Sequence, residues 1–194
     1  MQKCNTGMVK DLTHDEVAEV GARKLRAMGY PISFANMTSA THGEQPDALG
    51  MNAYAESFLL EAKISRSDFL SDKNKPWRKE GCGVGMRRAY ITPRGLLNIS
   101  DIPYGWELWE VHGKNKPIVK VIKGQVKKII DHPHCSGKVA SYSLENMDSE
   151  EFTHFKRSYS EFREEACWAL KVLRRAKDDG VNIEKYANGG FKND

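Results

Sequence analysis

The sequence predicts a mixed α/β domain whose central sheet is flanked by helices and followed by a long amphipathic C-terminal helix. Three observations support this prediction. They are a capped amphipathic segment near the N-terminus, a series of short apolar segments separated by turn residues, and a change to helical spacing after residue 147. With 194 residues, of which 40% are hydrophobic and 29% charged, the composition suits one ordinary globular domain with an appendage.

The first helix is predicted over residues 13–28. Thr13 followed three residues later by Glu16 is a capping-box pattern, which marks a helix start. Apolar residues then recur at helical spacing and form one face. Gly29 and Pro31 end the helix.

Strands follow this helix, and a second helix interrupts them. Strands are predicted over residues 32–37, 47–52, 58–64, 88–92, 106–111, 118–122 and 125–130. Ser65 is a suitable N-cap for a short helix that runs through Asp72 and is ended by Pro76. Residues 38–45 and 131–146 are predicted to be loops, so the chain begins helix, strand, strand, strand, helix, strand.

Two acids and one lysine form the candidate site. Side chains alternate along a strand, so Glu61 and Lys63 project from the same face of the strand over 58–64. The opposite face of this strand is apolar and is expected to pack against a helix. Asp47 opens the preceding strand. Two carboxylates and one ammonium suit a magnesium-dependent phosphodiesterase, in which the acids hold a hard cation beside the attacking water. The alternatives are a Pro-Asp turn at Asp47 and a surface salt bridge between Glu61 and Lys63.

These residues resemble a known family. Asp47 followed by Glu61-Ala62-Lys63 resembles the PD-(D/E)XK nuclease superfamily. The run from Glu61 to Lys73 is similar to the bacterial DNA-repair family called MmcB and to related phage nuclease-like proteins, in which a Glu-x-Lys strand precedes Ser, an Asp-Phe pair and an Asp-x-Lys helix. Gly95-Leu96-Leu97 and Ile102-Pro103-x-Gly105-Trp106 resemble that family's downstream segments. The resemblance covers roughly residues 47–111 and implies a restriction-endonuclease-like mixed sheet.

The resemblance also implies roles. Asp47 and Glu61 would bind Mg²⁺ or Mn²⁺ together with the carbonyl oxygen of Ala62, and Lys63 would orient or deprotonate the water and stabilise charge on the phosphate. A glutamate on the first helix is a further catalytic candidate, and we favour Glu16 over Glu19, although the capping box also explains Glu16.

The implied activity is cleavage of DNA phosphodiester bonds by metal-activated water, in DNA repair or phage DNA metabolism. The alternative is a catalytically inactive protein of the same fold that binds nucleic acid or a host protein. A group of polar, basic and aromatic residues near the site suits contacts to nucleic acid, although a solvated helix face accounts for it equally well. Its members are Ser65, Arg66, Lys73, Lys75, Trp77, Arg78 and Arg88.

The C-terminal third has a heptad pattern. After a helix start at residues 148–151, aromatic and small apolar residues recur in steps of three and four up to residue 176. We predict a nuclease-like domain over 1–146, a helix over 147–180 that packs on it, and a flexible tail over 181–194. The alternative for the helix is a homodimer contact through residues 150–177.

Charge and cysteine content restrict the setting. A net charge of +4 and a pI near 8.8 permit a polyanionic partner such as DNA. No apolar run approaches a membrane span and the N-terminus lacks an apolar signal core, so we expect a cytoplasmic protein without a membrane partner. His132, His134 and Cys135 are candidates for a zinc site, although a polar loop is the favoured interpretation.

Overall fold

The computed structural model describes residues 12–36, 44–54, 56–79, 82–113, 115–131, 136–154, 169–170, 173–176 and 178–181. The chain divides into two compact units, Met1–Arg157 and Ser158–Asp194. The sheet and the candidate site belong to the first unit. Across the described residues, no helix is both long and apolar enough to cross a membrane.

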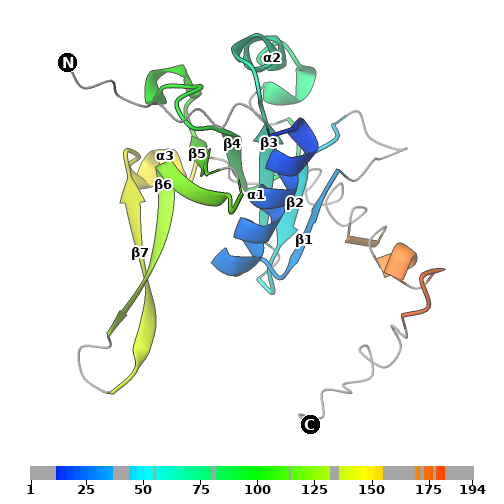
Figure 1. Ribbon diagram of the computed structural model, residues 1–194, viewed down its shortest axis with the longest axis vertical. Helices are drawn as coiled ribbons and strands as arrows, with labels where there is room; N and C mark the ends of the chain where they lie inside the picture. Colours follow the sequence, from blue (N-terminus) through cyan, green and yellow to red (C-terminus); the bar gives the residue numbers. More distant parts are fainter. Residues whose placement is uncertain are drawn as a thin grey trace. The chain divides into compact units, whose positions relative to one another are not determined.

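The first unit is built on a mixed sheet with helices beside it (Figure 1). Its first half contains α1 (His14–Met28), β1 (Ile32–Ala35), β2 (Ala48–Met51), β3 (Ser57–Ala62), α2 (Arg66–Asp72) and the 3-10 helix η1 (Pro76–Arg78). Its second half contains β4 (Arg87–Pro93), the 3-10 helix η2 (Ile99–Asp101), β5 (Trp106–His112), β6 (Ile118–Asp131), β7 (Lys138–Glu145) and α3 (Ser149–Phe152). This order confirms the predicted helix, strand, strand, strand, helix, strand.

The seven strands lie in sequence order across the sheet. The pairings β1–β2 and β2–β3 are antiparallel, β3–β4 and β4–β5 are parallel, and β5–β6 and β6–β7 are antiparallel. The prediction of a mixed sheet flanked by helices is therefore confirmed. The parallel core, β3 to β5, is buried along almost its whole length.

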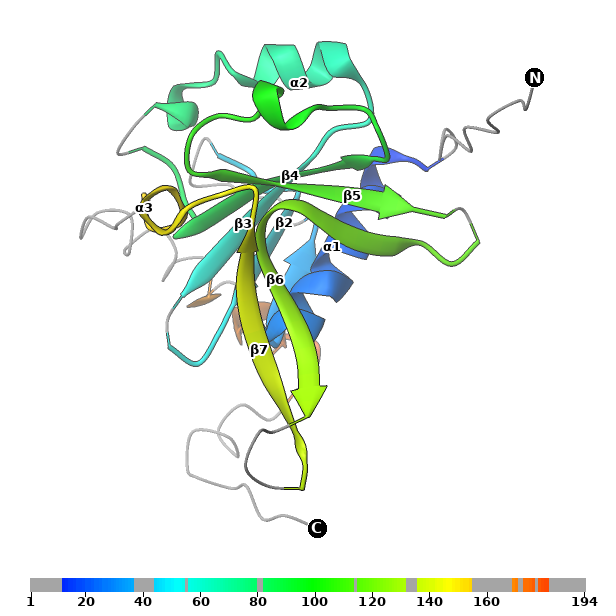
Figure 2. The ribbon, with the colours of Figure 1, turned by 90° about the vertical axis from the view of Figure 1, so that its left-hand side faces the viewer.

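Strand β3 separates two layers of side chains. Phe58, Leu60 and Ala62 join the core beneath α1, which confirms the predicted apolar face. Ile64 was expected to continue that face but is 44% exposed, because the pairing of this segment with β4 ends at Lys63. On the other face α2 packs through Phe69, whose ring meets that of Tyr90 edge to face at 4.9 Å. Figure 2 shows α1 and α2 on opposite sides of the sheet.

Strand β6 differs from the prediction. It is one strand of 14 residues, where the sequence indicated two, and β7 occupies part of the predicted loop over 131–146. Up to Lys123 β6 pairs with β5, and from Gly124 onward it pairs with β7. Gly124 has a φ of +129°, which allows the strand to bend between its two partners. The resulting β6–β7 ribbon extends away from the rest of the sheet (Figures 1 and 2).

The C-terminal prediction is met only at its start. Asp148 caps α3 by accepting a hydrogen bond from the Glu151 amide at 2.8 Å, but α3 ends at Phe152, so a single long helix is not confirmed. Residues 155–168 lie outside the described residues, as do His132, His134 and Cys135, so the homodimer and the zinc site stay predictions. Glu151 binds the Gly105 amide and Lys123, which ties α3 to β5 and β6 within the first unit.

Candidate active site

The structure brings the three predicted residues together. Lys63 follows β3 directly, and its amide donates to the Ile91 carbonyl at 3.0 Å, so the strand geometry continues through Lys63. Its side chain therefore lies on the same face as that of Glu61. The Lys63 Nζ atom is 3.0 Å from Glu61 Oε2 and 3.9 Å from Asp47 Oδ2. Glu61 and Lys63 are only 2% and 3% exposed, so this is a buried site.

Asp47 lies at the start of β2, where the sheet meets the N-terminus of α1. Its Oδ2 atom accepts a hydrogen bond from the Ala62 amide at 2.8 Å and lies 3.2 Å from His14 Nε2. Burial and the neighbouring charge of Glu61 raise the pKa of Asp47 to about 6, although Lys63 and His14 oppose this shift. Burial and the Glu61 charge disfavour the ionised form of Asp47, so a cation placed beside Asp47 would stabilise that form.

Asp72, the last residue of α2, anchors the cations of the site. Lys63 Nζ, Lys75 Nζ and Arg78 Nε lie 3.3, 2.8 and 2.6 Å from its carboxylate, and the Tyr90 hydroxyl donates to it at 2.9 Å. Burial alone would disfavour the ionised form, but these cations hold the pKa of Asp72 well below its usual range. Asp72 is therefore a fixed negative charge behind Lys63.

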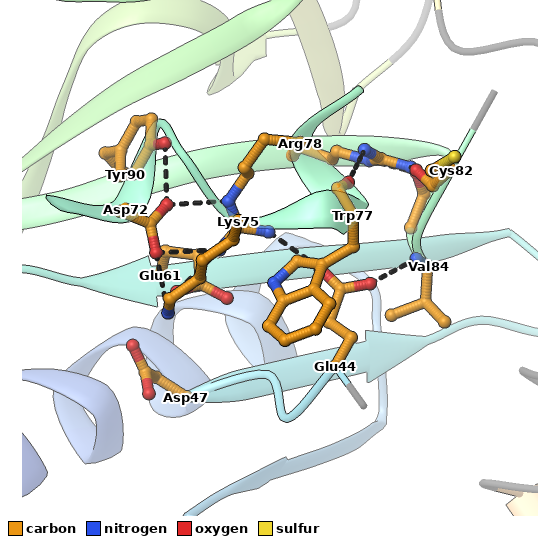
Figure 3. A network of polar contacts seen from close by, with 12 residues as sticks. Glu44, Asp47, Glu61, Asp72, Lys75, Trp77, Arg78, Cys82, Val84 and Tyr90 are labelled. Atoms are coloured by element: carbon orange, nitrogen blue, oxygen red, sulfur yellow. Dashed lines mark hydrogen bonds and ion pairs between the residues drawn. The ribbon is translucent and has the colours of Figure 1, made fainter. Parts of the chain in front are cut away.

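Arg78 joins three carboxylates from different parts of the chain (Figure 3). Its guanidinium nitrogens lie 2.7 Å from Glu44, 2.9 Å from Glu61 and 2.6 Å from Asp72. Glu44 also accepts the Val84 amide at 2.6 Å, and burial raises the pKa of its carboxyl to about 7. Arg78 therefore fixes the orientation of Glu61 and offsets part of its negative charge.

Two residues of the predicted nucleic-acid-binding set lie inside the protein. The Arg78 side chain is only 6% exposed and pairs with the three carboxylates just described. Arg88 is 3% exposed, and its guanidinium donates to the carbonyls of Gly85 and Cys82 at 3.2 and 2.8 Å. Because both guanidiniums face the interior, neither residue belongs to the proposed nucleic-acid contact surface.

The other members of that set are at or near the surface. Ser65 caps α2 by accepting a hydrogen bond from the Asp68 amide at 3.2 Å, which confirms its predicted N-cap role. Arg66 pairs with Asp101, donating to it at 2.8 Å. The remaining three are exposed or half-buried: Lys73, Lys75 and Trp77.

The first helix presents a histidine to the site. Glu16 is exposed and completes the capping box, with its Oε2 atom 2.7 Å from the Thr13 amide. His14, two residues earlier, is the α1 side chain that reaches Asp47. The sequence alone did not indicate His14, Glu44 and Asp72 as site residues. His14 lies in the capping-box segment of the first helix, and Asp72 lies in the run from Glu61 to Lys73. No local sequence pattern marks Glu44.

The acids retain oxygens that can bind a cation. The closest contacts of Asp47 are made by Oδ2 and those of Glu61 by Oε2, so Oδ1 and Oε1 are the oxygens farther from these partners. Magnesium in proteins is commonly held by one or two carboxylates, with waters and substrate oxygens completing its shell. The donor set fits this pattern, although no three His, Cys, Asp or Glu side chains of the described part form a complete ligand group.

Comparison with known proteins adds little. No protein-family model matches the chain, and no curated protein matches it. One solved structure is similar, a protein of unknown function from Silicibacter pomeroyi. It is 20% identical, the match covers 86% of this chain and 95% of the other, and the TM-score is 0.44.

Proposed function

We propose that this protein is a metal-dependent nuclease of the restriction-endonuclease-like, PD-(D/E)XK type that cleaves DNA. The observation that carries the proposal is the position of the Lys63 ammonium, which lies between the carboxylates of Asp47 and Glu61 on one side of the sheet. The orientation of Lys63 by Asp72 supports it.

The residues have distinct roles in this proposal. Asp47 and Glu61 would hold the ion, with the carbonyl of Ala62 as a further ligand. When bound, Mg²⁺ or Mn²⁺ would supply an activated water and offset charge on the phosphate. Burial opposes the charged form of Lys63, but Glu61, Asp72 and Asp47 outweigh it and raise the pKa of the ammonium. Lys63 therefore serves as a fixed positive charge that orients water and stabilises the developing phosphorane charge.

A second function is favoured by the same contacts. Lys63 and Arg78 already pair with Glu61, so its charge is offset without a metal ion. This arrangement suits a protein of the same fold that binds nucleic acid, or a host protein, without cutting.

A cleavage assay tests the proposal. Purified protein is incubated with single-stranded, duplex and branched DNA in Mn²⁺ or Mg²⁺, and Glu61→Gln and Lys63→Met are compared with the wild type. We expect each variant to lose at least about 100-fold in rate, the usual effect of removing one group that stabilises the transition state.

Glu107→Gln is the matched control. Glu107 is also 2% exposed, lies on β5 and is bonded to an arginine, Arg87, so its loss disturbs the fold in a similar way without touching the site. Each variant is first shown to be folded by circular dichroism. If Glu61→Gln cleaves as fast as Glu107→Gln, the proposal is wrong. If the wild type binds DNA without cutting any substrate, the second function is correct.

A further inference from the structure

An open groove lies between the C-terminal half of α1 and β6. Its volume is about 440 Å³. Figure 2 shows the two elements beside each other, and Lys127 of β6 reaches across to donate to the Ala27 carbonyl of α1 at 3.3 Å. Its lining combines apolar side chains with charged ones. The lining residues that matter here are Lys24, Val119, Val121, Val126, Lys127 and Glu145. We call this the Lys24–Lys127 groove.

Positive charge accumulates at this groove. Lys24 is half-buried, and both its burial and the nearby charge of Lys127 lower the pKa of its ammonium. Glu145 is the one carboxylate lining the groove among the described residues, and Lys128 lies 3.9 Å from it. Among the described residues, three lysines line the groove, Lys24, Lys120 and Lys127, and with Glu145 they leave a charge of +2. Positive charge without enough nearby acid attracts anions to a surface.

The groove is connected to the candidate site through α1. His14 at the start of the helix contacts Asp47, and Lys24 lies ten residues further along. Ten residues of α-helix rise about 15 Å, which matches roughly four to five nucleotides of one DNA strand at 3.4 Å each. A single strand of four to five nucleotides therefore spans the length of α1 between His14 and Lys24.

We propose that the Lys24–Lys127 groove binds the phosphate backbone of the nucleic acid substrate, away from the bond that is cut. This inference rests on the proposed function. In this proposal α1 and β6 contact the phosphate backbone of the nucleic acid. Arg78 and Arg88 do not make such contacts, because they face inward. Lys127 also has a structural role, because it bonds a carbonyl in the last turn of α1, where carbonyls lack helical partners. Within the described part of the chain Lys24 forms no ion pair, so its variant is the sharper test.

The salt dependence of DNA binding tests this proposal. The affinity for a fluorescein-labelled DNA duplex is measured by anisotropy without divalent metal, from about 50 to 200 mM salt. Each lysine–phosphate contact contributes about 1 to the slope of log affinity against log salt. We expect Lys24→Gln to reduce this slope by about 1, and the double variant Lys24→Gln/Lys127→Gln to reduce it by about 2.

The control double variant is Lys116→Gln/Lys138→Gln, which removes the same charge from positions outside the groove. Its slope should stay within the error of the wild type. The proposal is overturned if the two double variants behave alike, or if the wild type binds no DNA. Cleavage in Mn²⁺ is measured on the same proteins. Groove variants that bind and cut like the wild type refute the groove alone, whereas a wild type that never cuts refutes the proposed function.

Discussion

Glu44 is a buried acid that pairs with a shared arginine. It is 4% exposed and shares Arg78 with Glu61 and Asp72. Because that guanidinium is divided among three carboxylates, it compensates Glu44 only in part. Burial therefore dominates and raises the pKa of Glu44 from 4.5 to about 7.

This pKa predicts how stability depends on pH. Between pH 4.5 and 7 the folded protein keeps a proton on Glu44 that the unfolded chain has lost, so the free energy of unfolding falls as pH rises through this window. At 1.36 kcal/mol per pH unit, the contribution of Glu44 is at most about 3 kcal/mol. Glu44→Gln should flatten the decrease, without abolishing it, because the pKa of Asp47 is also raised.

Urea unfolding followed by tryptophan fluorescence at pH 4.5 and pH 7 measures this effect. Glu145→Gln, at a largely exposed carboxylate of the ribbon, serves as the control and should keep the wild-type dependence. An unchanged dependence in Glu44→Gln would show that Glu44 is ionised throughout the window.

The sequence predicted part of this network for a local reason. The shared face of Glu61 and Lys63 follows from strand alternation, which involves only neighbouring residues. The pairing of Glu44 with Val84 joins residues forty apart, and nothing in the sequence around Glu44 indicates it. The inward direction of Arg78 was missed for the same reason, since its partners come from separate segments.

Strand β6 shows why element boundaries were misjudged. In the sequence Gly124 looks like a break between two strands. The segment after it mixes lysines with apolar residues and does not give one apolar face. In the structure the same glycine is the bend at which β6 changes partner from β5 to β7. β7 was missed because its residues are mostly exposed and give little hydrophobic contrast.

Substitution at this bend should be costly. In Gly124→Ala the new Cβ atom would overlap the Glu107 carboxylate, which Arg87 and Trp109 hold in place. The φ of +129° adds strain for any residue with a side chain. We expect the free energy of unfolding to fall by more than about 2 kcal/mol in urea titrations.

Gly29→Ala separates strain from overlap. Gly29 also has a positive φ, +106°, but nothing lies within 4 Å of its Cβ position. It should lose only the strain of about 1–2 kcal/mol. Equal losses at Gly29 and Gly124 would mean that the contact with Glu107 is unimportant.

Stability should be uneven across the molecule. Strand β3 is buried along its length and has partners on both sides, whereas the outer part of the β6–β7 ribbon is largely exposed, including Ile129 at 61%. A two-stranded ribbon with little buried apolar surface is marginally stable in water. We expect its amides beyond residue 126 to exchange by local opening, far faster than those of β3, which should require global unfolding.

Native-state hydrogen exchange with residue resolution checks this expectation. The part of β6 that pairs with β5 is an internal control, because Val119 and Val121 pack against the core. Equal protection in both halves of β6 would show that the ribbon belongs to the cooperative core. Added DNA that protects the ribbon would extend the proposed contact beyond the Lys24–Lys127 groove.

The sequence by itself determined the features that depend on neighbours along the chain. These are the cap of α1, the cap of α2, the alternation of β3 and the pairing of Glu61 with Lys63. Only the tertiary structure decided that His14 meets Asp47, that Asp72 lies behind Lys63, and that Arg78 faces inward. The physical reason is that buried charges are stable only with partners, and here the partners come from segments that folding brings together.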